Sequence, residues 1–266
     1  MDDVTVQKLR DKCRRLRNEA ESVIINELAR DIIPAMKELP DQRLGRSTDQ
    51  HWCNSVPVPL NAASLANPLP MPKPKPDLVF GYSEEAFTSN QLFTIDLLVD
   101  DQFGRSYAVP DQKVRFPFLE IEFKSQAKNG THYVATNQAA GAGAIALNGH
   151  LDLIQRSFGL ESFDYQEPRY FSISLDHELA RINVHWLGAP AEGEQHSFHV
   201  EGLSQHLLRD SNGIRAASRA IKNILDYGAD RRLQAVCETL DAYRETVLRT
   251  REAATFTPDK RNDAIA

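Results

Sequence analysis

Apolar residues recur every three or four positions from Val6 to Arg30, which is the spacing of one face of an amphipathic helix. Pro34 is expected to end or kink this helix. Eight of the fourteen prolines then lie between Pro40 and Pro76, mixed with Asn and Ser. This composition predicts a long connection, partly polyproline-like, rather than a strand or a helix.

The middle of the chain alternates between strand and helix patterns. PDLVFGY predicts a strand that starts at its proline, and FPFLEIEFKS alternates strictly, as strands do. Between them, SEEAFTSNQLFTIDLLV has helical spacing with Ser83 as its cap. After them, ATNQAAGAGAIALNGHLDLIQRSFG predicts a helix whose small residues permit close approach to a sheet.

The C-terminal part predicts a hairpin followed by helices. RYFSISLD and ARINVHWLG alternate around a short polar turn, and QHSFHVEG is a candidate edge strand. Helices are expected from Ile214 to Tyr227 and from Asp230 to about Arg251, with Gly228 as a C-terminal cap. The whole order predicts an α/β fold in which helices flank a central mixed sheet.

Four parts are expected along the chain. An N-terminal helical segment, residues 1–39, packs on the core, and residues 40–76 form the proline-rich connection. Residues 77–252 form the core with additional C-terminal helices, and the polar tail, residues 253–266, is expected to be flexible.

Composition and charge narrow the classes of function. The chain has 266 residues, 41% hydrophobic and 26% charged, which is typical of a globular protein. A net charge of −6 excludes coating of nucleic acid by bulk electrostatics. No apolar stretch approaches the ~18 residues of a membrane span, and the N-terminus is charged where a signal peptide is apolar. These patterns predict an intracellular protein, in the nucleus or the cytoplasm, with no membrane partner and with reduced cysteines.

The strictly alternating strand carries the first candidate chemistry. Its period of two places Glu120, Glu122 and Lys124 on one face. A solvated outer face would give the same pattern. Asp77 favours a functional interpretation, because it opens an apolar strand where a carboxylate has no packing role.

The first helix offers a second candidate, Glu27. At ~100° per residue, Glu27 falls near the middle of the apolar face and should point inward. A buried carboxylate needs a cation, a hydrogen-bond network or a metal. Its role is therefore either an ion pair with a core-facing base or a catalytic one. Glu19 and Glu21 fall off this face and are interpreted as surface charges.

Pro76-Asp77, followed by Glu122-Phe123-Lys124, resembles the PD-(D/E)XK signature of restriction-endonuclease-like nucleases. In that family a helix carrying a glutamate precedes the motif and a helix often carrying a glutamine follows it. Glu27 and Gln138 match these two positions. The resemblance covers residues 27 to the 170s, the family's αβββαβ core, and extends to uncharacterised fungal proteins described as PD-(D/E)XK nuclease-like.

One departure concerns the aspartate. The interval from Asp77 to Glu122 is longer than is usual in the family, and Asp111 in YAVPDQKVRF offers a rival at a more typical distance. Asp77 is favoured because an apolar strand follows it, whereas a polar, turn-like segment follows Asp111.

The resemblance implies a metal-dependent phosphodiesterase, with DNA as the expected substrate and endonuclease cleavage as the expected activity. Mg²⁺ or Mn²⁺ would be held by Asp77, Glu122 and the carbonyl of Phe123, with Lys124 acting on the attacking water. Glu27 would hold a second ion or a metal-bound water, and Gln138 would contact the water or the phosphate. Glu120 is either an accessory ligand or the partner of a base.

Two questions stay open in the sequence. A catalytically silent protein of this fold would bind nucleic acid or another protein instead, and the acidic pI of about 5.8 favours that alternative. Cleavage of both DNA strands would favour a homodimer, for which the sequence carries no direct sign.

Overall fold

A computed structural model describes residues 1–57, 72–99, 104–128, 130–191 and 196–255. Its strands form one six-stranded sheet in chain order. Every neighbouring pair is antiparallel except β3 and β4, which are parallel. The strands are β1 (Leu44–Thr48), β2 (Leu78–Tyr82), β3 (Arg115–Phe123), β4 (Tyr170–Leu175), β5 (Leu179–Gly188) and β6 (Ser197–Leu207). The predicted α/β class with a mixed sheet is therefore confirmed.

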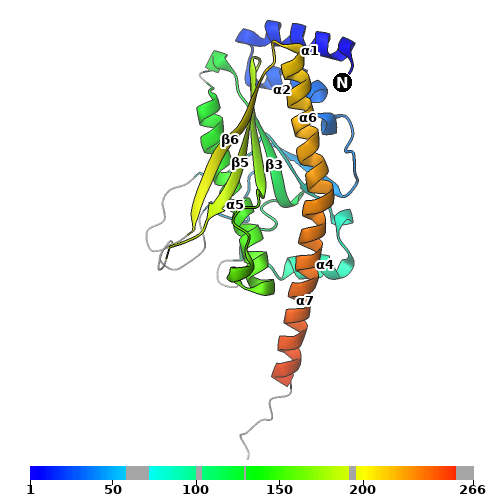
Figure 1. The fold of residues 1–266 in the computed structure, drawn as a ribbon, viewed down its shortest axis with the longest axis vertical. Helices are drawn as coiled ribbons and strands as arrows, with labels where there is room; N and C mark the ends of the chain where they lie inside the picture. The colour runs from blue at the N-terminus through cyan, green and yellow to red at the C-terminus, as the bar shows by residue number, and fades with distance from the viewer. Residues whose placement is uncertain (58–71, 100–103, 129, 192–195, 256–266) are drawn as a thin grey trace, which may run out of the picture.

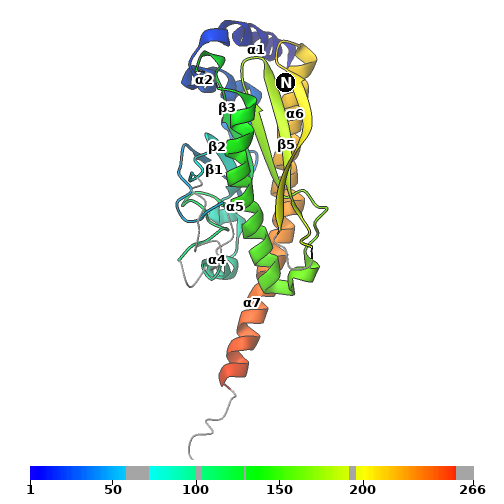
Figure 2. The same cartoon turned by 90° about the vertical axis from the view of Figure 1, so that its left-hand side faces the viewer.

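Helices cover both faces of this sheet (Figures 1 and 2). On one face α5 crosses β3, β4 and β5, while α6 lies on the other, and α1 and α2 lie across one end. The α-helices are α1 (Asp3–Arg15), α2 (Glu21–Ile32), α4 (Ser89–Asp96), α5 (His132–Phe158), α6 (Ser211–Tyr227) and α7 (Leu233–Thr255). Short 3-10 turns are η1 (Leu16–Asn18), η2 (Pro34–Met36), η3 (Glu84–Ala86), η4 (Gln126–Lys128) and η5 (Leu160–Ser162).

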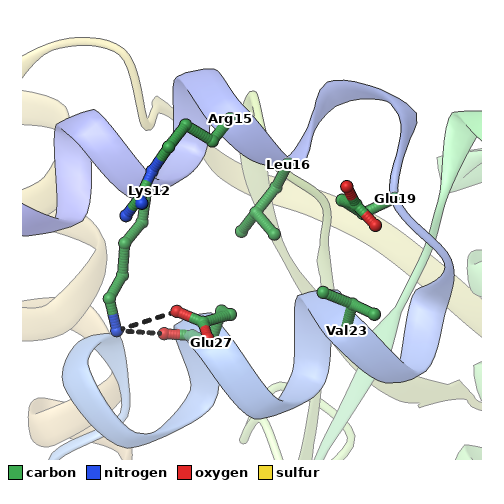
Figure 3. A pocket seen from close by; sticks show the side chains of 6 residues that line it. All are labelled: Lys12, Arg15, Leu16, Glu19, Val23 and Glu27. Carbon is green, nitrogen blue, oxygen red and sulfur yellow. Dashed lines mark hydrogen bonds and ion pairs between the residues drawn. The ribbon is translucent and has the colours of Figure 1, made fainter.

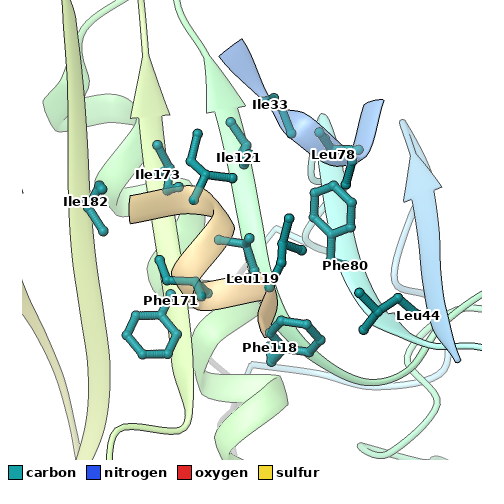
Figure 4. Packing of buried hydrophobic residues seen from close by; sticks show 14 of the residues in the cluster. Ile33, Leu44, Leu78, Phe80, Phe118, Leu119, Ile121, Phe171, Ile173 and Ile182 are labelled. Carbon is teal, nitrogen blue, oxygen red and sulfur yellow. The ribbon is translucent and has the colours of Figure 1, made fainter. Parts of the chain in front are cut away.

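The main core lies between the sheet and the helices opposite α5. Figure 4 shows Leu119 and Ile121 of β3 beside Phe171 and Ile173 of β4, all of them buried. Ile24 and Leu28 of α2 and Ile221 of α6 belong to the same cluster. This face of β3 is apolar because alternate side chains point the same way, so its acidic residues face α5 instead.

A π-helical turn, η6 (Gly228–Arg232), joins α6 and α7 into one long helical unit whose C-terminal end projects beyond the sheet (Figure 1). Gly228 is the C-cap residue of α6, as predicted, but its φ of −61° is helical, so it does not end the helical run. A Cβ built at Gly228 would lie 2.2 Å from the Phe118 ring. Glycine is required here for close packing rather than for a turn.

Three other boundaries differ from the predictions. The first helix is two helices, because the chain turns through η1 and Ala20 before α2 begins. The proline-rich connection contains β1, whose Leu44 pairs with Tyr82 of β2. The helix predicted after Ser83 begins at Ser89, and the side chains of its N-cap Thr88 and of Gln91 form a capping box.

The predicted hairpin is confirmed as β4 and β5, and the candidate edge strand is β6. Cys13, Cys53 and Cys237 are free thiols, as expected. Part of the proline-rich connection, 58–71, and most of the expected tail, 256–266, lie outside the described residues; 253–255 belong to α7.

Candidate functional site

Two carboxylates meet where β2 begins and β3 ends. The backbone N–H of Phe123 donates to Asp77 Oδ2 over 2.8 Å, and Glu122 Oε1 lies 3.4 Å from the backbone nitrogen of Asp77. The antiparallel register explains this, because Leu78 lies opposite Ile121 and the next residues out are Asp77 and Glu122. Residues 45 positions apart in sequence are therefore neighbours.

Lys124 completes a cluster of three charged groups. Its Nζ donates to Glu122 Oε2 over 3.0 Å and to the Phe123 carbonyl over 2.8 Å, and it lies 3.8 Å from Glu21 Oε2. Glu122 and Lys124 are 4% and 5% exposed, so their charges interact with little screening by water. We call Asp77, Glu122 and Lys124 the acidic–lysine cluster.

Burial disfavours the charged forms of both carboxylates, and repulsion by Asp77 adds to this effect at Glu122. Loss of hydration, together with the neighbouring Asp77, raises the pKa of Glu122 to about 7 despite the opposing effect of Lys124. Burial likewise raises the pKa of Asp77, although the Phe123 N–H and Lys124 oppose this. A site of this kind gains from an additional positive charge.

The oxygen atoms of the cluster are suitable ligands for Mg²⁺ or Mn²⁺. Among the residues that the structure describes, no three His, Cys, Asp or Glu side chains form a preformed metal site. Magnesium, however, is typically held by one or two carboxylates and keeps its other places for water and phosphate. Asp77, Glu122 and the Phe123 carbonyl supply this donor set, and the Lys124 ammonium already contacts two of these groups.

A cavity of about 360 Å³ lies beside the cluster, on the α5 side of the sheet. Glu122 and the wholly buried Glu120 lie in its wall, and Gln138 and Asn137 of α5 contribute amides. Gln138, the predicted glutamine, thus shares a cavity with Glu122. The Gln138 side chain is exposed and belongs to the N-terminal part of α5.

Glu120 faces the same cavity but has a neutral partner. The Tyr170 hydroxyl donates to Glu120 Oε2 over 2.9 Å, whereas Oε1 has no hydrogen-bond partner among the described residues. Burial, and then the nearby Glu122, raise the pKa of Glu120 well above its usual range. The sequence left two roles open for Glu120, an accessory metal ligand or the partner of a base. Among the described residues, no base forms an ion pair or a hydrogen bond with Glu120.

Asp111 is committed to a turn. Its Oδ1 accepts the backbone N–H groups of Lys113 and Val114 at 2.6 and 3.0 Å. Such contacts are typical of an aspartate that stabilises a turn. The structure therefore brings Asp77, and not Asp111, to Glu122.

Glu27 does not point into the core, so that prediction is wrong. Its carboxylate is 46% exposed and pairs with Lys12 of α1 over 3.2 Å, at a separate hollow between α1 and α2 (Figure 3). The physical reason is the break at η1, because a helical phase counted from α1 does not continue into α2. Of the two roles left open, the structure contains the ion pair.

Glu21 is the glutamate that α2 brings to the cluster, and sequence reasoning missed it. It lies in the first turn of α2, and Lys124 is 3.8 Å away. A signal was present in the sequence, since acidic residues favour the first turn of a helix, but it required locating the start of α2.

The fold and the cluster together define an α/β protein with a buried carboxylate–lysine site on a mixed sheet. A family model described as "Domain of unknown function (DUF7924)" matches residues 8–240, so the chain belongs to that family. No curated protein and no solved structure matches the chain. In the described residues, no helix combines the length and apolar character of a membrane span.

Proposed function

We propose that this protein is a metal-dependent nuclease that hydrolyses phosphodiester bonds, with DNA as substrate and endonuclease cleavage as its activity. The observation that carries the proposal is the acidic–lysine cluster: the half-buried carboxylate of Asp77 and the buried one of Glu122, both with raised pKa values, and a buried lysine within 3.0 Å of Glu122. The order α2, β1, β2, β3, α5, β4, with α4 inserted between β2 and β3, also agrees with the αβββαβ core that the PD-(D/E)XK resemblance implies.

Asp77, Glu122 and the Phe123 carbonyl are the groups that would hold Mg²⁺ or Mn²⁺. When bound, the metal would supply positive charge to the phosphoryl oxygens and acidify a bound water. Lys124 is placed to orient the attacking water and to stabilise the charge that develops on phosphorus. Glu21, 3.8 Å from the Lys124 ammonium, would orient it from α2, and Gln138, in the cavity wall, would contact the water or the phosphate from α5.

The acidic net charge of −6 requires that contacts with nucleic acid be local. Lys73 would provide such a contact, since it lines the cavity beside Glu122; Lys75 lines the same cavity, and its ammonium pairs with Asp49 at 2.6 Å. A phosphate backbone that crosses this rim would reach the cluster without a broadly basic surface.

The test is cleavage of plasmid, single-stranded DNA and RNA in Mg²⁺, Mn²⁺ or EDTA. We expect metal-dependent cutting that Asp77→Ala and Lys124→Ala each reduce by about 100-fold or more, the typical contribution of such a group. Lys113→Ala is the matched control, since Lys113 is an exposed lysine outside the cluster.

A second candidate is a silent protein of the same fold that binds nucleic acid or another protein; the acidic pI of about 5.8 favours it. Binding of Mn²⁺ by the wild type without cleavage of any of these substrates would decide for it.

A further inference from the structure

The cavity beside the acidic–lysine cluster has a polar group in its wall with no partner. Glu120 is 0% exposed, and its Oε1 makes no hydrogen bond within the described residues. The Tyr170 hydroxyl holds Oε2 at 2.9 Å, so the orientation of the carboxyl group is fixed. An unpaired buried oxygen is costly, and a ligand group that reached it would remove this cost.

The remaining walls are suited to a flat ring. Pro74, Pro76 and Gly141 are buried residues of the cavity wall and carry no polar side-chain atoms. Asn137 and Gln138 supply amides that donate and accept hydrogen bonds, and Lys73 and Lys75 are exposed beside them. A volume of about 360 Å³ is within the range of small-molecule sites, roughly 300–1,000 Å³.

We infer that this cavity receives one unpaired nucleobase of the substrate, with the edge of the base on Glu120 and the adjoining phosphates beside Lys73 and the acidic–lysine cluster. The inference rests on the proposed function and adds the substrate class. A base inside a duplex is stacked and paired, so it enters such a cavity only from a single strand or after extrusion. Single-stranded DNA is therefore the preferred substrate.

The experiment uses oligonucleotides with a single 2-aminopurine, whose fluorescence rises when it leaves the base stack. Binding is followed in Ca²⁺, and cleavage is followed separately in Mg²⁺. With wild type, we expect a clear rise for a single strand, little change for a duplex, and faster cutting of the single strand.

Two independent variants test the cavity. Gly141→Leu places a larger side chain on its wall and should abolish the rise. Glu120→Leu removes the hydrogen-bonding group and should weaken single-strand binding about tenfold, the size of one lost hydrogen bond to a buried group. Tyr133→Leu is the matched control and should keep the rise, because Tyr133 is an exposed residue of α5 that does not line the cavity. Thermal melting verifies that each variant is folded.

Two results would overturn this inference without contradicting the proposed function. One is a wild type that cuts DNA without any fluorescence change, and the other is a fluorescence change that persists in both cavity variants. The same holds if Glu120→Leu weakens Ca²⁺ binding measured by calorimetry without DNA, since Glu120 would then be a metal ligand. If wild type neither binds nor cuts any nucleic acid, the proposed function fails, and this inference fails with it.

Discussion

The backbone N–H of Phe123 donates a 2.8 Å hydrogen bond to the carboxylate of Asp77. This contact is made by the main chain of the residue between Glu122 and Lys124, so the sheet itself sets the distance between the aspartate and the other two charged groups. Movement of β2 relative to β3 would separate the cluster.

The two candidate aspartates should respond to substitution in opposite ways. We expect Asp77→Ala to abolish metal-dependent cleavage. Asp111→Ala should leave the cluster intact but reduce the free energy of unfolding by about 1–2 kcal/mol, because the N–H groups of Lys113 and Val114 lose their acceptor. Cleavage assays and urea denaturation separate the two effects. Loss of cleavage in Asp111→Ala at full stability would contradict this assignment.

The two glutamates of α2 form a second matched pair. Glu21→Gln should lower the cleavage rate, because it removes a charge 3.8 Å from the Lys124 ammonium. Glu27→Gln should leave the rate unchanged and cost at most about 1 kcal/mol of stability, since its ion pair with Lys12 is half exposed. The measurement is the initial rate of cleavage at saturating Mg²⁺. A lower rate in Glu27→Gln together with an unchanged rate in Glu21→Gln would contradict this prediction and assign the functional role to Glu27.

The contribution of Glu122 to the stability of the metal-free protein should fall as pH rises, whereas the buried His150 and His185, whose pKa values burial lowers, act in the opposite direction. The pKa of Glu122 is raised from its usual 4.5 to about 7, so the folded state favours the protonated acid. Its contribution is complete below pH 4.5 and is lost as pH rises through about 7. The raised pKa values of Asp77 and Glu120 act in the same direction.

Melting in EDTA between pH 5 and 8 tests this contribution, because the melting temperature of wild type should fall relative to that of Glu122→Gln as pH rises. Added Mg²⁺ should raise the melting temperature more at pH 8 than at pH 5, because protons compete with the metal. A difference in melting temperature between wild type and Glu122→Gln that stays constant in EDTA over this range would contradict the prediction.

Arg232 should contribute strongly to stability. It is 3% exposed, donates to the carbonyls of Arg169 and Phe116 and to the Tyr82 hydroxyl, and lies over the Tyr82 and Phe118 rings. Arg232→Leu leaves buried carbonyls without donors, and we expect a loss of about 3 kcal/mol or more. The exposed neighbour provides the control: Arg231→Leu should change urea stability by less than about 0.5 kcal/mol.

Gly228→Ala should be destabilising by about 1–3 kcal/mol, because its Cβ would lie 2.2 Å from the Phe118 ring. Gly141→Ala serves for comparison, since its Cβ would meet the nearest atom at 3.5 Å, an ordinary contact. In a helix that substitution should be neutral or stabilising by up to about 1 kcal/mol. Equal melting temperatures for the two variants would mean that the chain around Gly228 and Phe118 shifts enough to accommodate the added methyl group.

The sequence predicted the elements with strong periodicity. Alternation located β3 and placed Glu120, Glu122 and Lys124 together, and the apolar run after Asp77 located β2. The errors occurred where tertiary contacts override local pattern. β1 lies within proline-rich sequence and exists because it pairs with β2, and the glutamate of the first helix was misjudged because a three-residue turn, η1, resets the helical phase.

The contacts of Arg232 have a consequence for how the chain unfolds. They join the helical unit to carbonyls at the start of β3 and just before β4, elements that are distant in sequence. The helical unit of α6 and α7 is therefore not an appendage that can be removed from a self-sufficient sheet. Helix and sheet should melt in a single cooperative transition, and a chain that ends before Arg232 should fail to fold.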